Sequence, residues 1–434
     1  MLSILGFLMV ISIIVILLKG KMSPIVVLIL VPLVAALIAG FGIEEIGEMV
    51  KGGIGTVQNN SILFIFSIIF FGLMSDVGVF DGMVSALVKR AGNNVVLITV
   101  ATGVIATIAH LDGATATTVL VTVPAMYPIY KKMNIRPQVL ILILASAMGV
   151  MNLLPWGGPV ARSAVVLGMD ANDLWLRLIP LQVLGVIFTL GLAAILGIIE
   201  KKKGAGISIE EATAIEIGQE DDIKGQDLKR PKLLWFNLLL TVAVIGTLVW
   251  DVMPAYLVFM IGLCLGLVIN FPSLKAQDAR IKAHAPAALV IAATMLAAGV
   301  MVGIMDGTGM LEAMAGSMLS IVPDFLGRYV HLVFGVIALP LGMMIGTDAY
   351  FYGLMPLVLE VGSQFGVEPF NTATTMLVGK NISLLVSPIV PATFLALGLV
   401  DLDLKDHMKF SFKWLYGMSI LMLIASILIG LVHI

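Results

Sequence analysis

The sequence predicts an all-α polytopic membrane protein, built from two inverted repeats with broken helices near the membrane midplane. Hydrophobic residues make up 60% of the 434 residues and charged residues only 12%, and the mean hydropathy is +1.10. A soluble core could not bury that much apolar surface, so lipid must be the solvent. The spacing of the apolar segments and an internal repeat supply the rest of the prediction.

Composition also excludes several other classes of protein. The formal net charge of −2 gives no basic surface for nucleic acid. The single cysteine, Cys264, excludes a disulfide framework and a thiolate metal cluster. The 44 glycines and 18 prolines are typical of closely packed or broken membrane helices.

A bilayer crossing needs about 20 apolar residues, and most apolar segments of the chain are long enough. The segments 117–130 and 350–360 are too short, and each follows a polar break that contains glycine: HLDGAT at 110–115 and GTD at 346–348. The sequence therefore predicts two re-entrant hairpins, at 95–131 and 329–360, because non-helical backbone at membrane depth must lie inside protein or beside water. The segments in order are 2–18, 24–43, 61–80, 95–110, 117–130, 137–169, 174–199, 233–253, 255–272, 286–305, 329–345, 350–360, 370–400 and 410–432.

The chain is expected to divide at its one long polar stretch. Segment 200–232 is highly charged, contains no aromatic residue and is typical of a flexible linker. It separates a first repeat at 1–199 from a second at 233–434. Segment 2–18 is taken as the first crossing, because it lacks the charged start and the cleavage site of a signal peptide.

The two halves match at an offset near 230 residues. NLLPWGGP at 152–159 matches NISLLVSP at 381–388, so that Asn152 corresponds to Asn381. Pro124 corresponds to Pro356 within the two hairpins. The breaks within 137–169 and 370–400 are therefore equivalent, and both are expected near the membrane midplane.

The halves are expected to run in opposite directions across the cell membrane. With the hairpins counted as re-entrant, each half crosses five times, and an odd number inverts the second half. With the N-terminus outside and 200–232 in the cytoplasm, 20 of the 25 Lys and Arg residues lie inside, in agreement with the positive-inside rule. The exceptions are Lys51, Arg177 and Arg328 outside, and Arg162 and Lys380 within the membrane.

Inverted repeats with broken helices are typical of secondary transporters, whose substrate binds where the half-helix ends meet. Ionisable residues at these breaks are costly in lipid and so indicate function or pairing. Arg162 is expected to clamp a substrate carboxylate or to pair with Asp112 or Asp348. Asp112 and Asp348 are candidate ligands for a metal or another coupling cation, or proton carriers, with helix capping as the alternative. Lys380 is either a tethered cation at the site or a residue that snorkels.

The remaining predicted substrate contacts are polar or aromatic residues and free backbone groups. PWGGP at 155–159 must break a helix, and its backbone donors suit a carboxylate. Trp156 either closes the site or packs beside it. About half of the threonine hydroxyls are expected to bond to their own helix, and His110 to satisfy local backbone groups. Asp76 and Asp306 are expected only to end their helices. The predicted contacts are Thr115, Thr117, Thr118, Asn152, Trp156, Gly157, Gly158, Thr347, Asn381 and Ser387.

Four motifs resemble, in order, the citrate–divalent-metal:proton symporter family of the ion transporter superfamily. They are LDG at 111–113, PWGGPVAR at 155–162, TDAYFYGLMP at 347–356 and LLVSPIVPATFL at 384–395. The resemblance implies proton-driven uptake of citrate or a similar di- or tricarboxylate, as the free anion or as a complex with a divalent metal. It also implies a homodimer in which a transport domain moves against a fixed scaffold.

The sequence departs from the family pattern at four positions in three segments, and all fall at the predicted site. Ala114 stands where the family tip carries another acidic residue, Gly346 and Thr347 replace Ser-Asn before Asp348, and Lys380 precedes Asn381. Counted with Asp112 and Arg162, these changes make the site neutral rather than doubly negative. The sequence therefore predicts that binding depends less on divalent metal than in relatives, because Lys380 partly replaces the cation.

The sequence disfavours three other functions. A cation/proton antiporter would use the two aspartates alone, but Arg162 and Lys380 would repel a cation. A membrane-embedded enzyme is not expected, since the sequence has no HExxH, no Ser-His-Asp arrangement at the breaks and no glycine-rich phosphate loop. A channel is disfavoured because inverted broken-helix repeats favour alternating access.

Overall fold

The computed structural model describes residues 2–19, 21–79, 87, 90–206, 228–319, 323–388 and 390–433. Within these ranges the regular secondary structure is entirely helical, which confirms the predicted all-α class. The helices before the linker are α1 (Leu2–Leu18), α2 (Pro24–Ala39), α3 (Ile43–Asp76), α5 (Val95–Ala109), η1 (His110–Asp112), α6 (Thr115–Lys132), α7 (Pro137–Met151), α8 (Gly158–Leu167) and α9 (Ala171–Lys202).

The linker prediction falls largely on 207–227, which lies outside the described residues. The helices after it are η4 (Pro231–Leu233), α10 (Leu234–Trp250), α11 (Ala255–Asn270), α12 (Leu274–Gly307), α13 (Met310–Leu319), α14 (Asp324–Gly327), α15 (Val330–Met344), the π-helix η5 (Ala349–Leu354), α16 (Met355–Gln364), α17 (Pro369–Ile382), η6 (Leu384–Val386), α18 (Pro391–Leu399) and α19 (Leu404–Leu428).

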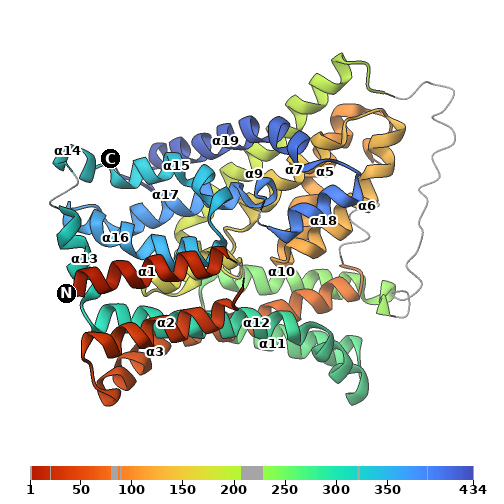
Figure 1. Cartoon of the computed structure of the whole chain (residues 1–434). Helices are drawn as coiled ribbons and strands as arrows, with labels where there is room; N and C mark the ends of the chain where they lie inside the picture. The colour runs from red at the N-terminus through yellow and green to blue at the C-terminus, as the bar shows by residue number, and fades with distance from the viewer. Residues whose placement is uncertain are drawn as a thin grey trace.

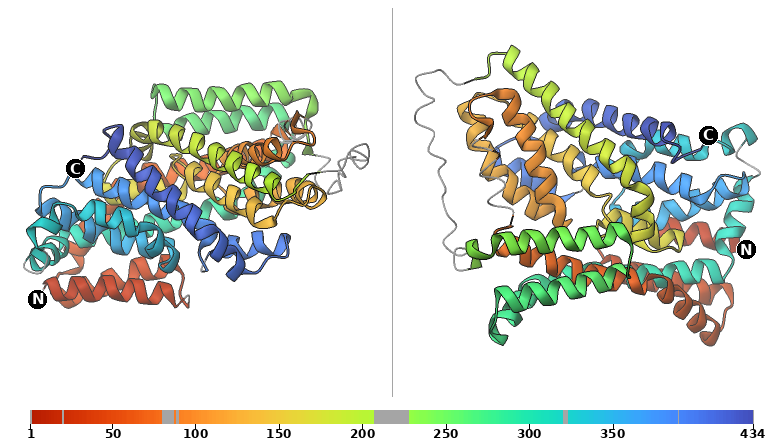
Figure 2. Two further views of the ribbon diagram at one scale, coloured as in Figure 1. Left: turned by 90° about the horizontal axis from the view of Figure 1, so that it is seen from above. Right: turned by 180° about the vertical axis from the view of Figure 1, so that it is seen from behind.

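The helices form two layers (Figure 1). The long-helix layer contains α1–α3 and α10–α12, which lie low in this view. The hairpin layer contains α5–α8 and α15–α18, with α9 and α19 running across it. Figure 2 shows the same separation from behind, and the second-half segment η5 packs against the first-half helix α1. The two halves of the chain are therefore interleaved in both layers.

The long-helix layer is held together by the close approach of α3 and α12. A Cβ added to Gly53 would collide with the carbonyl oxygen of Gly299, and one added to Gly299 would lie 2.8 Å from the Gly53 carbonyl oxygen. Small residues at such a crossing allow two membrane helices to pack backbone to backbone. Only glycine is compatible with this contact.

The apolar surface of the helices is that of a membrane protein. Six helices within the described ranges are long and apolar enough to cross a bilayer. One of them, Val95–Asp112, belongs to the first predicted hairpin, and its re-entrant path remains a prediction. The six are Ile43–Asp76, Val95–Asp112, Ala171–Lys202, Pro231–Trp250, Leu274–Gly307 and Leu404–Leu428.

The long helices α3 and α12 begin well before the apolar segments predicted at 61–80 and 286–305. Each has 34 residues, about 51 Å at 1.5 Å per residue, against a hydrocarbon core of about 30 Å. The first turn of α3 carries Glu44 and Glu45, and the Glu45 carboxylate accepts a hydrogen bond from Gly42 N at 2.8 Å. Hydropathy cannot detect such polar turns, although negative charge at a helix start favours them.

Candidate functional site

Both hairpin tips and both helix breaks meet around one cavity between the two layers. Its volume is about 250 Å³, just below the range of about 300–1,000 Å³ for small-molecule sites. The volume therefore suits a small metabolite. The predicted site residues that line it are Asp112, Thr115, Asn152, Trp156, Gly158, Arg162, Thr347, Lys380 and Asn381.

The first hairpin tip is closed by its own hydrogen bonds. Asp112 accepts a bond from the Ala114 amide at 2.8 Å, which closes the turn directly before α6, although no side chain caps the first amides of that helix. Although this bond holds the carboxylate, Asp112 still lines the cavity.

His110 joins the first tip to the first helix break. Its Nδ1 lies 2.6 Å from the Thr118 hydroxyl and its Nε2 lies 3.1 Å from Asn152 Oδ1. A neutral ring with the proton on Nε2 satisfies both contacts, because Nε2 then donates to Asn152 and Nδ1 accepts from Thr118. The ring is fully buried. His110 therefore bonds side chains of two elements rather than the local backbone groups expected for it.

Trp156 packs beside the cavity as well as lining it. Its Nε1 donates to the carbonyl oxygen of Leu111 at 2.6 Å, which ties the break to the tip. Its ring lies 4.9 Å from that of Phe71 on α3 and 5.1 Å from that of Phe259 on α11, measured between centroids. The side chain thus fills the boundary between the two layers and also borders the cavity.

The break between α7 and α8 directs the start of a helix at the cavity. Gly157 is the N-cap of α8, and Gly158 and Pro159 line the cavity wall. The first amides of a helix have no partner within it, and the helix dipole adds positive potential there. This end of α8 is therefore suited to a carboxylate.

Arg162 pairs with Asp348, the second of the two partners that the sequence suggested. Arg162 Nε lies 2.7 Å from Asp348 Oδ1, so the pair joins α8 to the second hairpin tip. The guanidinium also lines the cavity. Its Nη1 lies against Gly158, where an added Cβ would be 2.7 Å away. The positive charge thus stands directly over the start of α8.

Lys380 is held inside the protein and does not snorkel. Its side chain is 3% exposed. Its Nζ donates to the carbonyl oxygens of Gly342 at 2.6 Å and Ile345 at 3.3 Å. A lysine at these carbonyls caps the C-terminal end of α15, where the helix dipole is negative. Because Lys380 also lines the cavity, it contributes positive charge to the wall.

Asn381 has an amide group without a partner. The side chain is 1% exposed, and neither its oxygen nor its nitrogen makes a hydrogen bond among the described residues. Buried polar atoms are almost always bonded, so such a group calls for an explanation. Asn381 lines the cavity, and a polar ligand there would supply both missing bonds.

Five predicted site residues lie behind the cavity wall instead of lining it: Thr117, Thr118, Gly157, Asp348 and Ser387. Thr118 bonds to His110, and Asp348 holds Arg162. The Ser387 hydroxyl donates to the Met343 carbonyl oxygen at 2.9 Å. These residues lie next to the residues that line the cavity, and their direct contact with a substrate remains a prediction.

Sequence reasoning missed the side of the cavity that the long-helix layer provides. Phe64 and Ile68 on α3 and Ala287 and Ile291 on α12 line it. Each pair is four residues apart and so shares a helix face. An apolar pair of this kind cannot be distinguished from a lipid-facing one in the sequence alone.

A polar cluster near the same layer was also missed. Asp76 ends α3, as expected, but its carboxylate additionally accepts bonds from Arg280 at 3.1 Å and His284 at 2.8 Å. Both partners lie on α12, more than 200 residues away along the chain. No local pattern could have identified this cluster.

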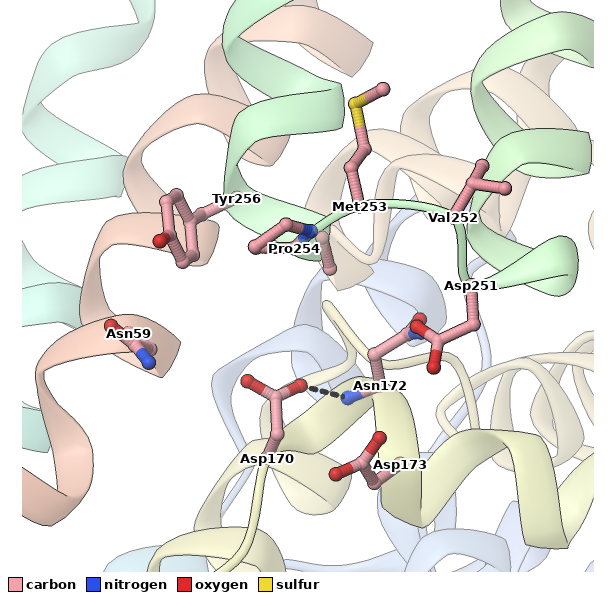
Figure 3. A pocket seen from close by; sticks show the side chains of 10 residues that line it. Asn59, Asp170, Asn172, Asp173, Asp251, Val252, Met253, Pro254 and Tyr256 are labelled. Carbon is pink, nitrogen blue, oxygen red and sulfur yellow. Dashed lines mark hydrogen bonds between the residues drawn. The ribbon is translucent and has the colours of Figure 1, made fainter.

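A separate hollow of about 440 Å³ contains none of the predicted site residues (Figure 3). Asp170, Asp173 and Asp251 line it, and Asp170 Oδ1 accepts a bond from the Asn172 amide at 2.7 Å. Burial raises the pKa of the Asp170 carboxyl, and the charges of Asp173 and Asp251 raise it further, against the lowering effect of the Asn172 bond. The hollow is therefore acidic and suits no carboxylate.

The fold and the cavity define a class: a multi-pass α-helical membrane carrier of small polar solutes. The CitMHS family, described as citrate transporter, matches residues 8–379. The chain belongs to this family, which confirms the resemblance read from its motifs and means that the protein is a transporter and not an enzyme.

Two relatives from Bacillus subtilis (strain 168) match over the full length of both chains. One, named citrate transporter, is 37% identical over 432 residues. The other, named Mg(2+)/citrate complex secondary transporter, is 38% identical over 444 residues. Among solved structures, the YdaH transporter of Alcanivorax borkumensis has a TM-score of 0.62 over 90% of each chain. At 13% identity that likeness concerns the fold alone.

Proposed function

We propose that this protein is a secondary active transporter that carries citrate or a similar di- or tricarboxylate together with protons, by alternating access. Family membership and the names of the two relatives support citrate as the substrate. The cavity between two layers of helices, with Arg162, Lys380 and Asn381 in its wall, supports a carrier in which the hairpin layer moves against the long-helix layer.

The unpartnered amide of Asn381 is the observation that carries the proposal. It borders the same cavity as the start of α8 and Arg162. A carboxylate that accepts bonds from the α8 amides and from Arg162 brings further oxygens within the cavity. Those oxygens accept from the Asn381 amide nitrogen, and a substrate hydroxyl donates to the amide oxygen. Citrate has both kinds of group.

Binding of citrate to purified protein tests this proposal directly. Asn381→Leu keeps the number and branching of the side-chain heavy atoms but removes both polar groups, so we expect a large loss of citrate affinity with little loss of stability. Thr375→Val is the matched control, because Thr375 is buried on the same helix and its hydroxyl already bonds to the Thr372 carbonyl oxygen. Equal citrate affinity in wild type and Asn381→Leu would contradict the proposed site.

The coupling proton is assigned to Asp112, the acidic residue that lines the cavity. Asp348 is the alternative carrier, but it is engaged by Arg162. A divalent metal, where it takes part, travels as part of the substrate in a citrate complex and meets the same carboxylates. Citrate-driven acidification of a reporter dye inside proteoliposomes would measure the coupling, and Asp112→Asn should abolish it.

The proposed transporter is a homodimer with its N-terminus outside and the linker in the cytoplasm. Labelling of single cysteines, in a background without Cys264, tests the inverted arrangement. A cysteine at Lys132 should react only from the cytoplasm and one at Glu368 only from outside; both positions are exposed. Labelling of both from one face would overturn the inverted repeat.

A cation/proton antiporter remains the rival function. Arg162 and Lys380 both line the cavity, and two positive charges there oppose a bare cation. An antiporter would exchange Na⁺ or Mg²⁺ for protons in proteoliposomes without citrate. Such exchange, together with an absence of citrate binding, would replace the proposal with this rival.

A further inference from the structure

A buried hydroxyl without a partner lies beside the Arg162–Asp348 pair. Tyr352 is fully buried, and its hydroxyl makes no hydrogen bond among the described residues. The Arg162 guanidinium carbon lies 6.0 Å from the centroid of its ring. Asp348 lies on the other side of this contact, paired with Arg162 Nε at 2.7 Å. The group therefore stands next to an ion pair to which it is not bonded.

The backbone that presents Tyr352 is unusual. Residues Ala349–Leu354 form a π-helix directly after the second tip. Such segments are rare and occur frequently at functional sites. Tyr350, two residues earlier in the same segment, is also fully buried, but its hydroxyl donates to the Met376 carbonyl oxygen at 3.0 Å. Of these two buried tyrosines in one short segment, only Tyr350 has its hydroxyl satisfied.

Packing alone does not account for the Tyr352 hydroxyl. The ring belongs to the apolar cluster formed with Met9 and Ile13 of α1 and Met301 of α12, and a phenylalanine ring would pack there as well. A buried hydroxyl without a partner costs free energy in the state in which it is unbonded. Its presence is explained if another state of the protein supplies the partner.

Substrate binding at Arg162 would leave the Asp348 carboxylate without a hydrogen-bond donor. In the structure Arg162 Nε is occupied by Asp348. A substrate carboxylate that makes its two bonds at the Nε–Nη2 edge of Arg162 competes with Asp348 for Nε. Asp348 then loses its partner in a partly buried place, where an unpaired carboxylate is costly. A nearby hydroxyl that donates to it offsets that cost.

We infer that Tyr352 is a positioning residue for transport: when a carboxylate substrate takes Arg162, the Tyr352 hydroxyl donates to the released Asp348. The inference rests on the proposed function, in which Arg162 binds a substrate carboxylate. Substrate recognition then includes an exchange of partners at the second tip: the Asp348 carboxylate leaves Arg162 and bonds to the Tyr352 hydroxyl. Tyr352 itself does not touch the substrate.

Two conservative variants separate this role from packing. Tyr352→Phe removes only the unbonded hydroxyl, so the thermal stability of the substrate-free protein should stay equal or rise, while citrate affinity should fall about tenfold, or about 1.4 kcal/mol. Tyr350→Phe is the matched control, because its hydroxyl is already bonded. It should lower the stability of the free protein and leave citrate affinity unchanged. Isothermal titration with citrate and melting curves without it measure both.

The outcomes of this experiment are distinct. In an Asp348→Ala background the affinity penalty of Tyr352→Phe should disappear, because the acceptor is gone. Unchanged citrate affinity in Tyr352→Phe overturns the inference, and so does a penalty that persists without Asp348. If wild type itself fails to bind citrate, the proposed function is wrong and the inference falls with it, so the two failures are distinguishable.

Discussion

The two hairpin tips follow a similar sequence plan but are held by different forces. At the first tip, neutral hydrogen bonds join His110, Thr118 and Asn152, and Asp112 accepts from backbone. At the second tip, a charged pair joins Asp348 to Arg162, and Lys380 holds the end of α15. Unpartnered polar groups lie beside the second tip, at Tyr352 and Asn381. The comparison suggests that the first tip is a fixed wall and the second tip the part that rearranges with substrate.

Removal of the charge at the second tip should have the largest effect. Arg162→Met leaves Asp348 without its partner, and the loss of one member of such a pair costs about 3–5 kcal/mol of stability. Citrate binding should be lost as well. The double variant Arg162→Met/Asp348→Asn should recover most of the melting temperature but no binding. Recovered binding in the double variant would show that Arg162 serves stability alone.

An apolar residue at the first tip should affect stability more than binding. His110→Leu leaves the amide oxygen of Asn152 without its partner, at a cost of about 1–3 kcal/mol, whereas the Thr118 hydroxyl keeps its bond to the Ala114 carbonyl oxygen. Citrate affinity should fall much less than in Arg162→Met, because His110 does not line the cavity. Melting curves and citrate titration on the same samples compare the two. A loss of affinity as large as that of Arg162→Met would remove the contrast between the tips.

A methyl group next to the Arg162 guanidinium tests the role of the second tip with less structural disturbance than Arg162→Met. In Gly158→Ala the new Cβ would lie 2.7 Å from Arg162 Nη1, so the guanidinium must shift. We expect about a tenfold loss of citrate affinity, equivalent to about 1.4 kcal/mol, with a small change in stability. Gly346→Ala at the second tip is the control, because an added Cβ there meets nothing within 4 Å. Equal affinities of both variants would argue against Arg162 as a substrate contact.

The smallest expected effect concerns Lys380 and divalent metal. If Lys380 partly replaces the cation of a metal–citrate complex, Lys380→Gln should make citrate binding a few-fold more dependent on Mg²⁺. The physical reason is the loss of one positive charge from the cavity wall. Citrate titrations across a range of Mg²⁺ concentrations, with a chelator at the low end, measure this. A wild type that binds only the metal complex, or an unchanged metal dependence in the variant, would refute the charge argument.

The helix ends could be predicted because their signals are local. Polar breaks with glycine at 110–115 and 346–348 coincide with the places where α5 gives way to α6 and α15 to η5. PWGGP likewise falls between α7 and α8. Proline and glycine act within a turn of where they stand, so the sequence carries this information directly.

The partners of the site residues could not be predicted in the same way. Arg162 had two candidate aspartates, and only the packing of the two halves against one another selects Asp348, 186 residues away. Lys380 was assigned to substrate or to the membrane surface, whereas its ammonium bonds to carbonyl oxygens at the end of α15. Those carbonyl oxygens can accept from Lys380 only because α15 ends next to α17, the helix that carries Lys380. The π-helix that carries Tyr352 has no sequence signature either.

The close contact of α3 with α12 bears on how the chain is made. During synthesis α3 enters the bilayer long before α12 has been translated. The face of α3 around Gly53 then has no partner, because its final neighbour, Gly299, does not yet exist. Neither lipid nor water fills a notch shaped for another backbone as well as α12 does. The first half is therefore expected to form a loosely packed intermediate in the membrane until α12 is made. A chaperone or insertase that binds α3 during this interval would raise the yield of assembled protein.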